Sequence, residues 1–79
     1  MNIQIYMEVP AIMNKGTVKW FNAEKGYGFI TGEDGKDYFF HYSQLVMEGF
    51  KTAEVGQKVE YTEASTDKGL RANDIHFAD

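Results

Sequence analysis

The stretch Lys25–Ile30, with the sequence KGYGFI, decides the fold. Successive side chains of a β-strand point to opposite faces, so Lys25, Tyr27 and Phe29 would share one face. The opposite face carries two glycines and Ile30, which we expect to enter the core. Glycine has no side chain to pack and weakens a strand, so these glycines indicate crowding or close backbone approach on the inner side. We therefore predict a strand with a core face and an outer face of one cation and two aromatic rings.

A second aromatic stretch, Asp37–Tyr42 (DYFFHY), follows after a short turn. The turn contains Asp34-Gly35, a pair that readily adopts the conformations a tight hairpin requires. The two stretches should therefore pair, and their outward aromatic rings should form one patch. By parity the outward residues are Asp37, Phe39 and His41, and the inward ones are Tyr38 and Phe40. A histidine between aromatic rings on an outer face indicates a stacking or hydrogen-bonding group.

A third stretch, Val18–Asn22 (VKWFN), places Trp20 and Phe21 side by side in the sequence. A regular strand would expose one ring and bury the other, whereas a local bulge would bring both to the surface. For Lys19 the sequence alone leaves two interpretations open, a solvated charge or a phosphate contact.

No window of the 79 residues keeps apolar side chains at helical spacing for three turns. Short strands separated by glycine-containing turns predict instead an all-β fold, and the short length favours a small five-stranded antiparallel OB-fold barrel. A long connection over 43–56 should contain at most one helical turn, near Ser43–Val46. The turn before the last strand is expected at Thr66–Gly69. The expected strands are Gly16–Asn22, Tyr27–Thr31, Asp37–Tyr42, Gln57–Glu63 and Leu70–Phe77.

Composition narrows the possible functions. The formal net charge is −4, which is unusual for a nucleic-acid binder, but the charge is uneven. Residues 15–29 hold three lysines and one glutamate, whereas residues 54–67 hold four acidic residues and one lysine. The chain has no cysteine and two distant histidines, so we expect no metal and no cofactor. No apolar run reaches the roughly 20 residues of a membrane span, so we expect a soluble, cytoplasmic protein with no membrane partner.

The first twelve residues, MNIQIYMEVPAI, differ from the rest. They contain the single proline and no glycine, and three of their apolar residues, Ile3, Ile5 and Val9, alternate. We expect residues 1–12 to be an extension, either flexible or docked along a sheet edge, and residues 13–79 to be the folded domain. A monomer is expected, with a dimer through the extension as the alternative.

Together these stretches resemble the bacterial cold-shock proteins and the cold-shock domain. The resemblance covers residues 13–77, and the motifs occur in the family's order without gaps. Lys25–Ile30 resembles the family's first ribonucleoprotein-type motif and Tyr38–Tyr42 its second. The other matching segments are Gly16–Asn22, Glu48–Thr52, Val55–Gln57 and Gly69–Ala72.

The resemblance implies an OB barrel that binds single-stranded RNA and DNA with little sequence choice and acts as an RNA chaperone, often in response to cold. It places Tyr42 on the binding face, although parity alone would bury it. It also gives Asp37 the role of accepting a hydrogen bond from a base edge. The nucleic-acid-binding residues that it implies are Lys19, Trp20, Phe21, Lys25, Tyr27, Phe29, Asp37, Phe39, His41, Tyr42, Phe50 and Lys68.

The sequence departs from the family pattern at four notable positions. Tyr38 and Phe40 are larger than the usual Val or Ala, Leu70 replaces a common proline, and Asp74 stands where Asn is usual. Other functions fit the sequence less well. An enzyme would need a nucleophile–base pair or convergent carboxylates, and an RNA-recognition motif would need two amphipathic helices. A protein-interaction barrel without a nucleic-acid ligand is the alternative that stays open.

Overall fold

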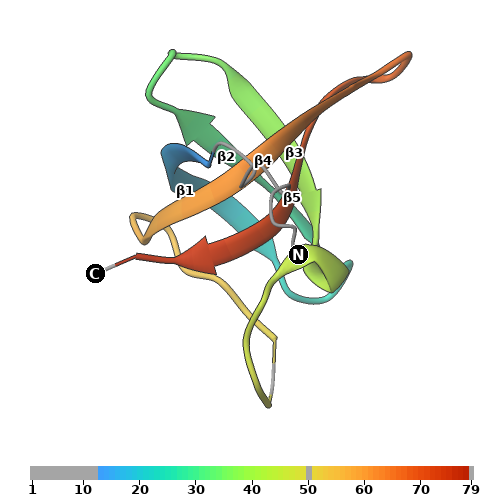
Figure 1. Ribbon diagram of the computed structural model, residues 1–79. Coiled ribbons are helices and arrows are strands. Elements are labelled where there is room, and N and C mark those ends of the chain that lie inside the picture. The colour runs from blue at the N-terminus through green and yellow to red at the C-terminus, as the bar shows by residue number, and fades with distance from the viewer. Residues whose placement is uncertain (1–12, 50, 79) are drawn as a thin grey trace, which may run out of the picture.

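Five strands and one short 3-10 helix make up the part of the chain that the computed structural model describes, residues 13–49 and 51–78 (Figure 1). The strands close into a barrel in the order β1-β2-β3-β5-β4, and β4 pairs with β1 to complete the circle. The all-β, five-stranded barrel predicted from the sequence is confirmed. The elements are β1 (Asn14–Asn22), β2 (Tyr27–Gly32), β3 (Asp37–His41), η1 (Tyr42–Gln44), β4 (Lys58–Thr66) and β5 (Gly69–Phe77).

The barrel is not antiparallel throughout, which corrects the prediction. Strands β3 and β5 run parallel, with Phe39 opposite Arg71, and Leu45 forms a further parallel bridge to Ile75. The reason is geometric, since strand directions cannot alternate all the way around a ring with an odd number of strands. One neighbouring pair must therefore be parallel, and here the connection over 42–57 brings β5 beside β3.

Strand lengths also differ from those expected. Strand β4 extends to Thr66 and pairs there with Gly69, so only Asp67 and Lys68 form the turn. The resulting β4–β5 hairpin projects beyond the rest of the barrel (Figure 1). Strand β3 ends at His41, one residue early, because the chain turns into the 3-10 helix η1 at Tyr42.

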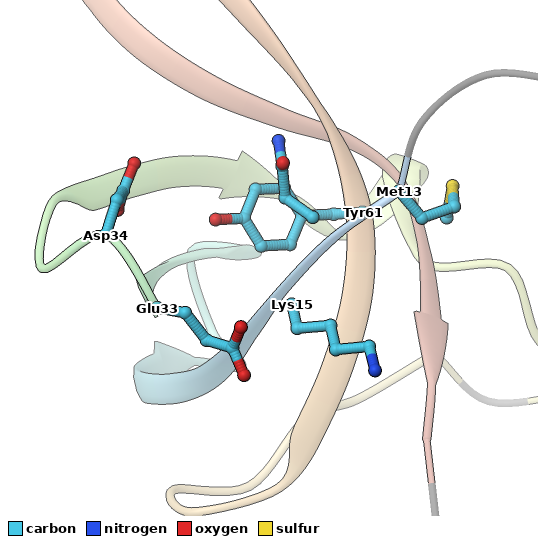
Figure 2. A pocket seen from close by; sticks show the side chains of 6 residues that line it. Met13, Lys15, Glu33, Asp34 and Tyr61 are labelled. Atoms are coloured by element: carbon cyan, nitrogen blue, oxygen red, sulfur yellow. The ribbon is translucent and has the colours of Figure 1, made fainter.

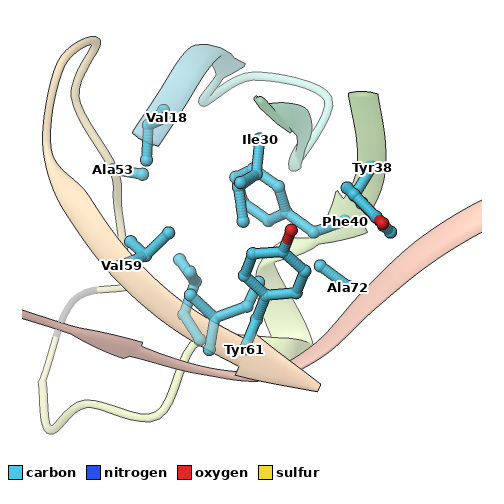
Figure 3. Close-up of a cluster of buried hydrophobic side chains, with 10 residues drawn as sticks. Val18, Ile30, Tyr38, Phe40, Ala53, Val59, Tyr61 and Ala72 are labelled. Atoms are coloured by element: carbon cyan, nitrogen blue, oxygen red, sulfur yellow. The ribbon is translucent and has the colours of Figure 1, made fainter. Parts of the chain in front are cut away.

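The core fills the barrel with side chains from all five strands, as Figure 3 shows. Tyr38 and Phe40 are each 1% exposed, so the inward face predicted for β3 is confirmed. The barrel accommodates the large Tyr38 beside a second tyrosine, Tyr61, with ring centroids 5.0 Å apart. The Tyr38 hydroxyl reaches the barrel end and donates to Asp34 at 2.6 Å. The buried core residues are Val18, Ile30, Tyr38, Phe40, Leu45, Ala53, Val59, Tyr61, Ala72 and Ile75.

Gly28 shows why the inner face of β2 carries glycine. A Cβ atom there would overlap the carbonyl oxygen of Trp20 and lie 2.9 Å from the Cα of Phe21. Both obstacles are backbone atoms of β1, which cannot move without breaking the pairing of the two strands. The close backbone approach predicted from the KGYGFI pattern is thus present.

Candidate nucleic-acid interface

A β-bulge in β1 positions the first aromatic ring. Val18 lies opposite Ile30 and Trp20 lies opposite Phe29, so Lys19 is the extra residue in β1. A bulge shifts the alternation of side chains by one residue, and Trp20 therefore joins Lys19 on the outer surface. The Trp20 side chain is 37% exposed.

The same bulge leaves Phe21 on the inner side, so the expectation that both rings reach the surface is only half met. Phe21 lies opposite Gly28, is half-buried and packs against the core. Its ring stacks on that of Phe40, with centroids 5.7 Å apart and an interplanar angle of 8°. One extra residue can turn only one of two adjacent side chains outward.

Four outward rings from β1, β2 and β3 touch in a chain, and we call this group the aromatic face. It consists of Trp20, Tyr27, Phe29 and Phe39. Centroid separations lie between 5.4 and 5.8 Å, within the range of favourable aromatic pairs. None of the four rings is fully buried. The pairing of Tyr27 with His41 and of Phe29 with Phe39 keeps the rings on one side of the sheet.

His41 and Tyr42 continue the aromatic surface at the end of β3. Both are exposed, and their rings meet edge to face at 4.6 Å. The Nδ1 atom of His41 accepts a hydrogen bond from the backbone N–H of Ser43 and caps η1. This cap starts the 3-10 turn that carries Tyr42 outward, so its side chain is 45% exposed despite the inward parity of its position.

Lys19 and Asp37 form an ion pair on the outer surface beside the aromatic face. The distance from Lys19 Nζ to Asp37 Oδ2 is 2.7 Å, and about half of each side chain is exposed. The hydrogen bond from Lys19 holds the pKa of Asp37 below its usual value, and Thr31 donates a second bond to the same carboxylate. Asp37 is thus kept ionised, so its carboxylate can accept a hydrogen bond. Lys19 lies on the same outer surface, and its half-exposed side chain can contact a bound ligand.

Two further predicted residues, Lys25 and Lys68, lie in turns and not on the strands of the aromatic face. Lys25 is exposed in the turn between β1 and β2, two residues before Tyr27 in the sequence. Lys68 is exposed in the β4–β5 turn and lines a hollow with Phe29 and Phe39. Phe50 lies outside the residues that the structure describes.

Sequence reasoning missed Arg71 as a member of this surface. Its guanidinium carbon lies 4.9 Å from the centroid of the Phe39 ring. The contact exists because β3 and β5 pair in parallel, and no local pattern around Arg71 announces that pairing. The family-matching segment Gly69–Ala72 contains Arg71, but that match did not place its side chain on the binding face.

A second hollow, of about 500 Å³, shares no residue with the aromatic face. It lies at the start of β1 beside the β2–β3 turn, where Glu33 and Asp34 flank the hydroxyl of Tyr61 (Figure 2). A hydrogen bond from Tyr38 lowers the pKa of Asp34, and burial raises the pKa of Tyr61 to about 12. This hollow therefore presents two carboxylates, the protonated phenol of Tyr61 and one cation, Lys15, a set with net negative charge that favours phosphate less than the aromatic face does.

Comparison with known proteins identifies the family. The family described as "'Cold-shock' DNA-binding domain" matches residues 14–77. The chain belongs to the cold-shock domain family. Its function is nucleic-acid binding of the cold-shock type, as the sequence motifs predicted. None of the helices in the described part of the chain has the length and hydropathy needed to span a membrane.

Several bacterial relatives of this cold-shock protein match over most of its length. It is 60% identical over 63 residues to Cold shock protein 1 of Lactiplantibacillus plantarum, covering 80% of this chain and 96% of the relative. It is 52% identical over 63 residues to the Major cold shock protein of Streptococcus pyogenes serotype M18, covering 80% and 94% of the two chains. Among solved structures, Drosophila Unr CSD456 has a TM-score of 0.73 and 21% identity. That match covers 89% of this chain and 28% of the other, and it shows a shared fold.

Proposed function

We propose that this protein binds single-stranded RNA and DNA by stacking unpaired bases on the aromatic face. The proposal rests on one observation: the four outward rings on β1, β2 and β3 contact one another and form a continuous aromatic surface. Each ring offers a stacking platform worth about 1–3 kcal/mol per base. Because every base has a stacking surface, such binding tolerates many sequences.

The distribution of charge favours single strands over duplexes. A duplex hides the surfaces of its bases, so binding it would depend on many phosphate contacts. The aromatic face is bordered by few cations, and one of them, Lys19, is paired with Asp37. The overall charge of −4 opposes a polyanion on the other surfaces. We propose that Lys19, Lys25 and Lys68 contact phosphates, while His41 and Tyr42 extend the stacking surface.

Base stacking of this strength supports an RNA chaperone function. A base-pair step in DNA contributes about 0.6–2.2 kcal/mol of stacking, which is comparable to the stacking of one base on one ring. A protein that captures four or more bases can therefore melt a short stem or keep it from forming. This competition matters most in the cold, when paired structures are more stable.

The remaining features of the proposal follow from the sequence. We place the protein in the cytoplasm, as a monomer that uses no cofactor and catalyses no reaction. Residues 13–79 are proposed as the cold-shock domain and residues 1–12 as an extension, flexible or docked at an edge, with dimerisation through it as the alternative. Deleting residues 1–12 and comparing mass in solution and melting temperature tests the extension.

A fluorescence titration tests the function. Oligonucleotides of six or seven pyrimidines should quench Trp20, because a base stacked on the indole changes its emission. A duplex of equal length should bind far more weakly, because its bases are paired. Equal affinity for the two would contradict the stacking proposal. Absence of binding to any single strand would leave the protein-interaction barrel as the better interpretation.

A further inference from the structure

Arg71 occupies a position from which it can read the base that stacks on Phe39. It lies opposite Phe39 across the parallel pairing of β3 and β5. Its side chain lines a hollow of about 270 Å³, together with Phe29, Phe39, Lys68 and Leu70. Within residues 13–49 and 51–78, no carboxylate forms an ion pair with Arg71. Its guanidinium is therefore held by the aromatic ring and not by a fixed anionic partner.

The resting contact between Arg71 and Phe39 must change when a base binds. The guanidinium carbon is 4.9 Å from the ring centroid, a gap too narrow for a base to enter between the two. An exposed cation–π contact is weaker than the stacking of a base on an aromatic ring. A base that stacks on this face of Phe39 would displace the guanidinium from the ring, and the freed guanidinium would lie beside the edge of that base.

Guanidinium chemistry determines which base edge fits this arrangement. Arginine presents five N–H donors in a planar fork and no acceptor. Guanine offers two adjacent acceptors, O6 and N7, which such a fork can engage at once. Adenine offers N7 beside an amino donor, and that donor would face the donors of the guanidinium. The two purines have similar stacking surfaces, so only their edges distinguish them here.

We propose that the hollow formed by Phe29, Phe39 and Arg71 is a guanine-preferring subsite, in which Phe39 stacks the base and Arg71 engages its O6 and N7. The proposal deepens the proposed function, since it assumes that single strands bind on the aromatic face. It makes Arg71 a specificity-determining residue on a surface whose other contacts tolerate many bases. Lys68, an exposed lining residue of the same hollow, contacts phosphate and reads no base.

Heptauridine carrying a single guanine or a single adenine at each position in turn tests the proposal. In Trp20 fluorescence titrations, guanine should bind at least about fivefold more tightly than adenine at one position or at adjacent ones, the low end of a bidentate arginine contact. Replacing that guanine by 7-deazaguanine, which lacks the N7 acceptor, should remove most of the gain. A guanine-to-adenine affinity ratio near one at every position would overturn the proposal.

Three variants distinguish recognition of the base edge from general attraction between a positive charge and the oligonucleotide. Arg71→Lys keeps the positive charge but lacks the planar fork, so its guanine-to-adenine affinity ratio should fall close to one. Arg71→Gln should shift the ratio towards adenine, because a glutamine amide matches adenine N6 and N7. Lys68→Gln is the matched control, and it should weaken both oligonucleotides equally and leave the ratio unchanged. A ratio fully retained in Arg71→Lys would contradict the role of Arg71.

Two controls keep the outcomes distinct. The melting temperature of each variant shows whether the barrel is intact, and little change is expected because Lys68 is exposed and Arg71 is only half-buried. Unmodified heptauridine tests the proposed function by itself. If wild-type protein fails to bind heptauridine, the stacking function fails. If it binds heptauridine but does not distinguish guanine from adenine, only the subsite proposal fails.

Discussion

The inner and outer faces of β3 use the same kind of side chain for different purposes. Phe40 points inward and is 1% exposed, whereas its neighbour Phe39 points outward and touches two rings of the aromatic face. Phe40 removes apolar surface from water and stabilises the barrel. Phe39 leaves part of its ring open, which weakens its contribution to stability but leaves a platform for a base. The alternation of side chains along β3 thus gives Phe40 a role in folding and Phe39 a role in binding.

The largest expected effect comes from the inner face. Phe40→Ala should lower the free energy of unfolding by about 3–5 kcal/mol, the range for large aromatic residues truncated in cores. Urea unfolding followed by fluorescence measures the loss. If the variant does not fold, Phe40→Leu removes less volume and should show a smaller loss with normal affinity for heptauridine. A Phe40→Ala barrel as stable as the wild type would mean that the ring is not part of the core.

The matched substitution on the outer face should reverse this pattern. Phe39→Ala should weaken binding of heptauridine by about 1–3 kcal/mol, the contribution of one base stacked on one ring. Its cost in unfolding free energy should be smaller than that of Phe40→Ala, about 1–3 kcal/mol, because Phe39 contacts two rings and each aromatic pair contributes about 0.5–1.5 kcal/mol. Titration and urea unfolding of the same sample give both numbers. A variant that unfolds but binds normally when folded would show that the two faces have been assigned the wrong way round.

A smaller effect is expected where the inner face reaches the barrel end. Tyr38→Phe removes the hydroxyl that donates to Asp34 at 2.6 Å. This bond lowers the pKa of Asp34 in the folded protein. Its stabilisation is therefore fully present above the unfolded carboxyl pKa of about 3.9 and is lost as the pH falls through the lower folded value.

Wild type should thus be more stable than Tyr38→Phe at pH 7, and the difference should shrink below about pH 4. Thermal unfolding of both proteins between pH 3 and pH 7 measures this. A stability difference that does not change over that range would show that Asp34 gains nothing from the hydroxyl.

The smallest expected effect concerns a cation on the outer face. If Lys19 leaves Asp37 to contact a phosphate, Lys19→Gln should reduce the slope of log affinity against log salt by about 0.7, the value for one contact to a single strand. Lys58→Gln is the matched control, because Lys58 is also exposed but lies on β4, opposite Thr17 in β1. An unchanged slope in Lys19→Gln would restrict Lys19 to its ion pair with Asp37.

Much of the fold was predictable because the alternation of side chains along a strand depends only on residues that are close in the sequence. The alternation in KGYGFI and DYFFHY assigned Tyr38 and Phe40 to the core and Phe29 and Phe39 to the surface, and the described structure agrees. The glycines of β2 indicated the close approach of β1 that Gly28 shows. These properties depend on residues that lie near one another in sequence.

The features that escaped prediction depend on distant parts of the chain or on one-residue irregularities. The contact of Arg71 with Phe39 requires the parallel closure of the barrel, which joins segments 32 positions apart. The adjacent Trp20 and Phe21 suggested a bulge, but not that Lys19 would be the extra residue and Phe21 would stay on the inner side. Family resemblance, and not parity, placed Tyr42 at the surface, because the cap that begins η1 overrides the alternation.

The central claim is that bases stack on the aromatic face, and NMR chemical-shift mapping with heptauridine tests it most directly. The largest changes should fall on ring and backbone signals of Trp20, Tyr27, Phe29 and Phe39. Signals of Asp34 and Tyr61, which line the hollow at the start of β1, should change little. Changes centred on that hollow, or spread evenly over the barrel, would contradict the account.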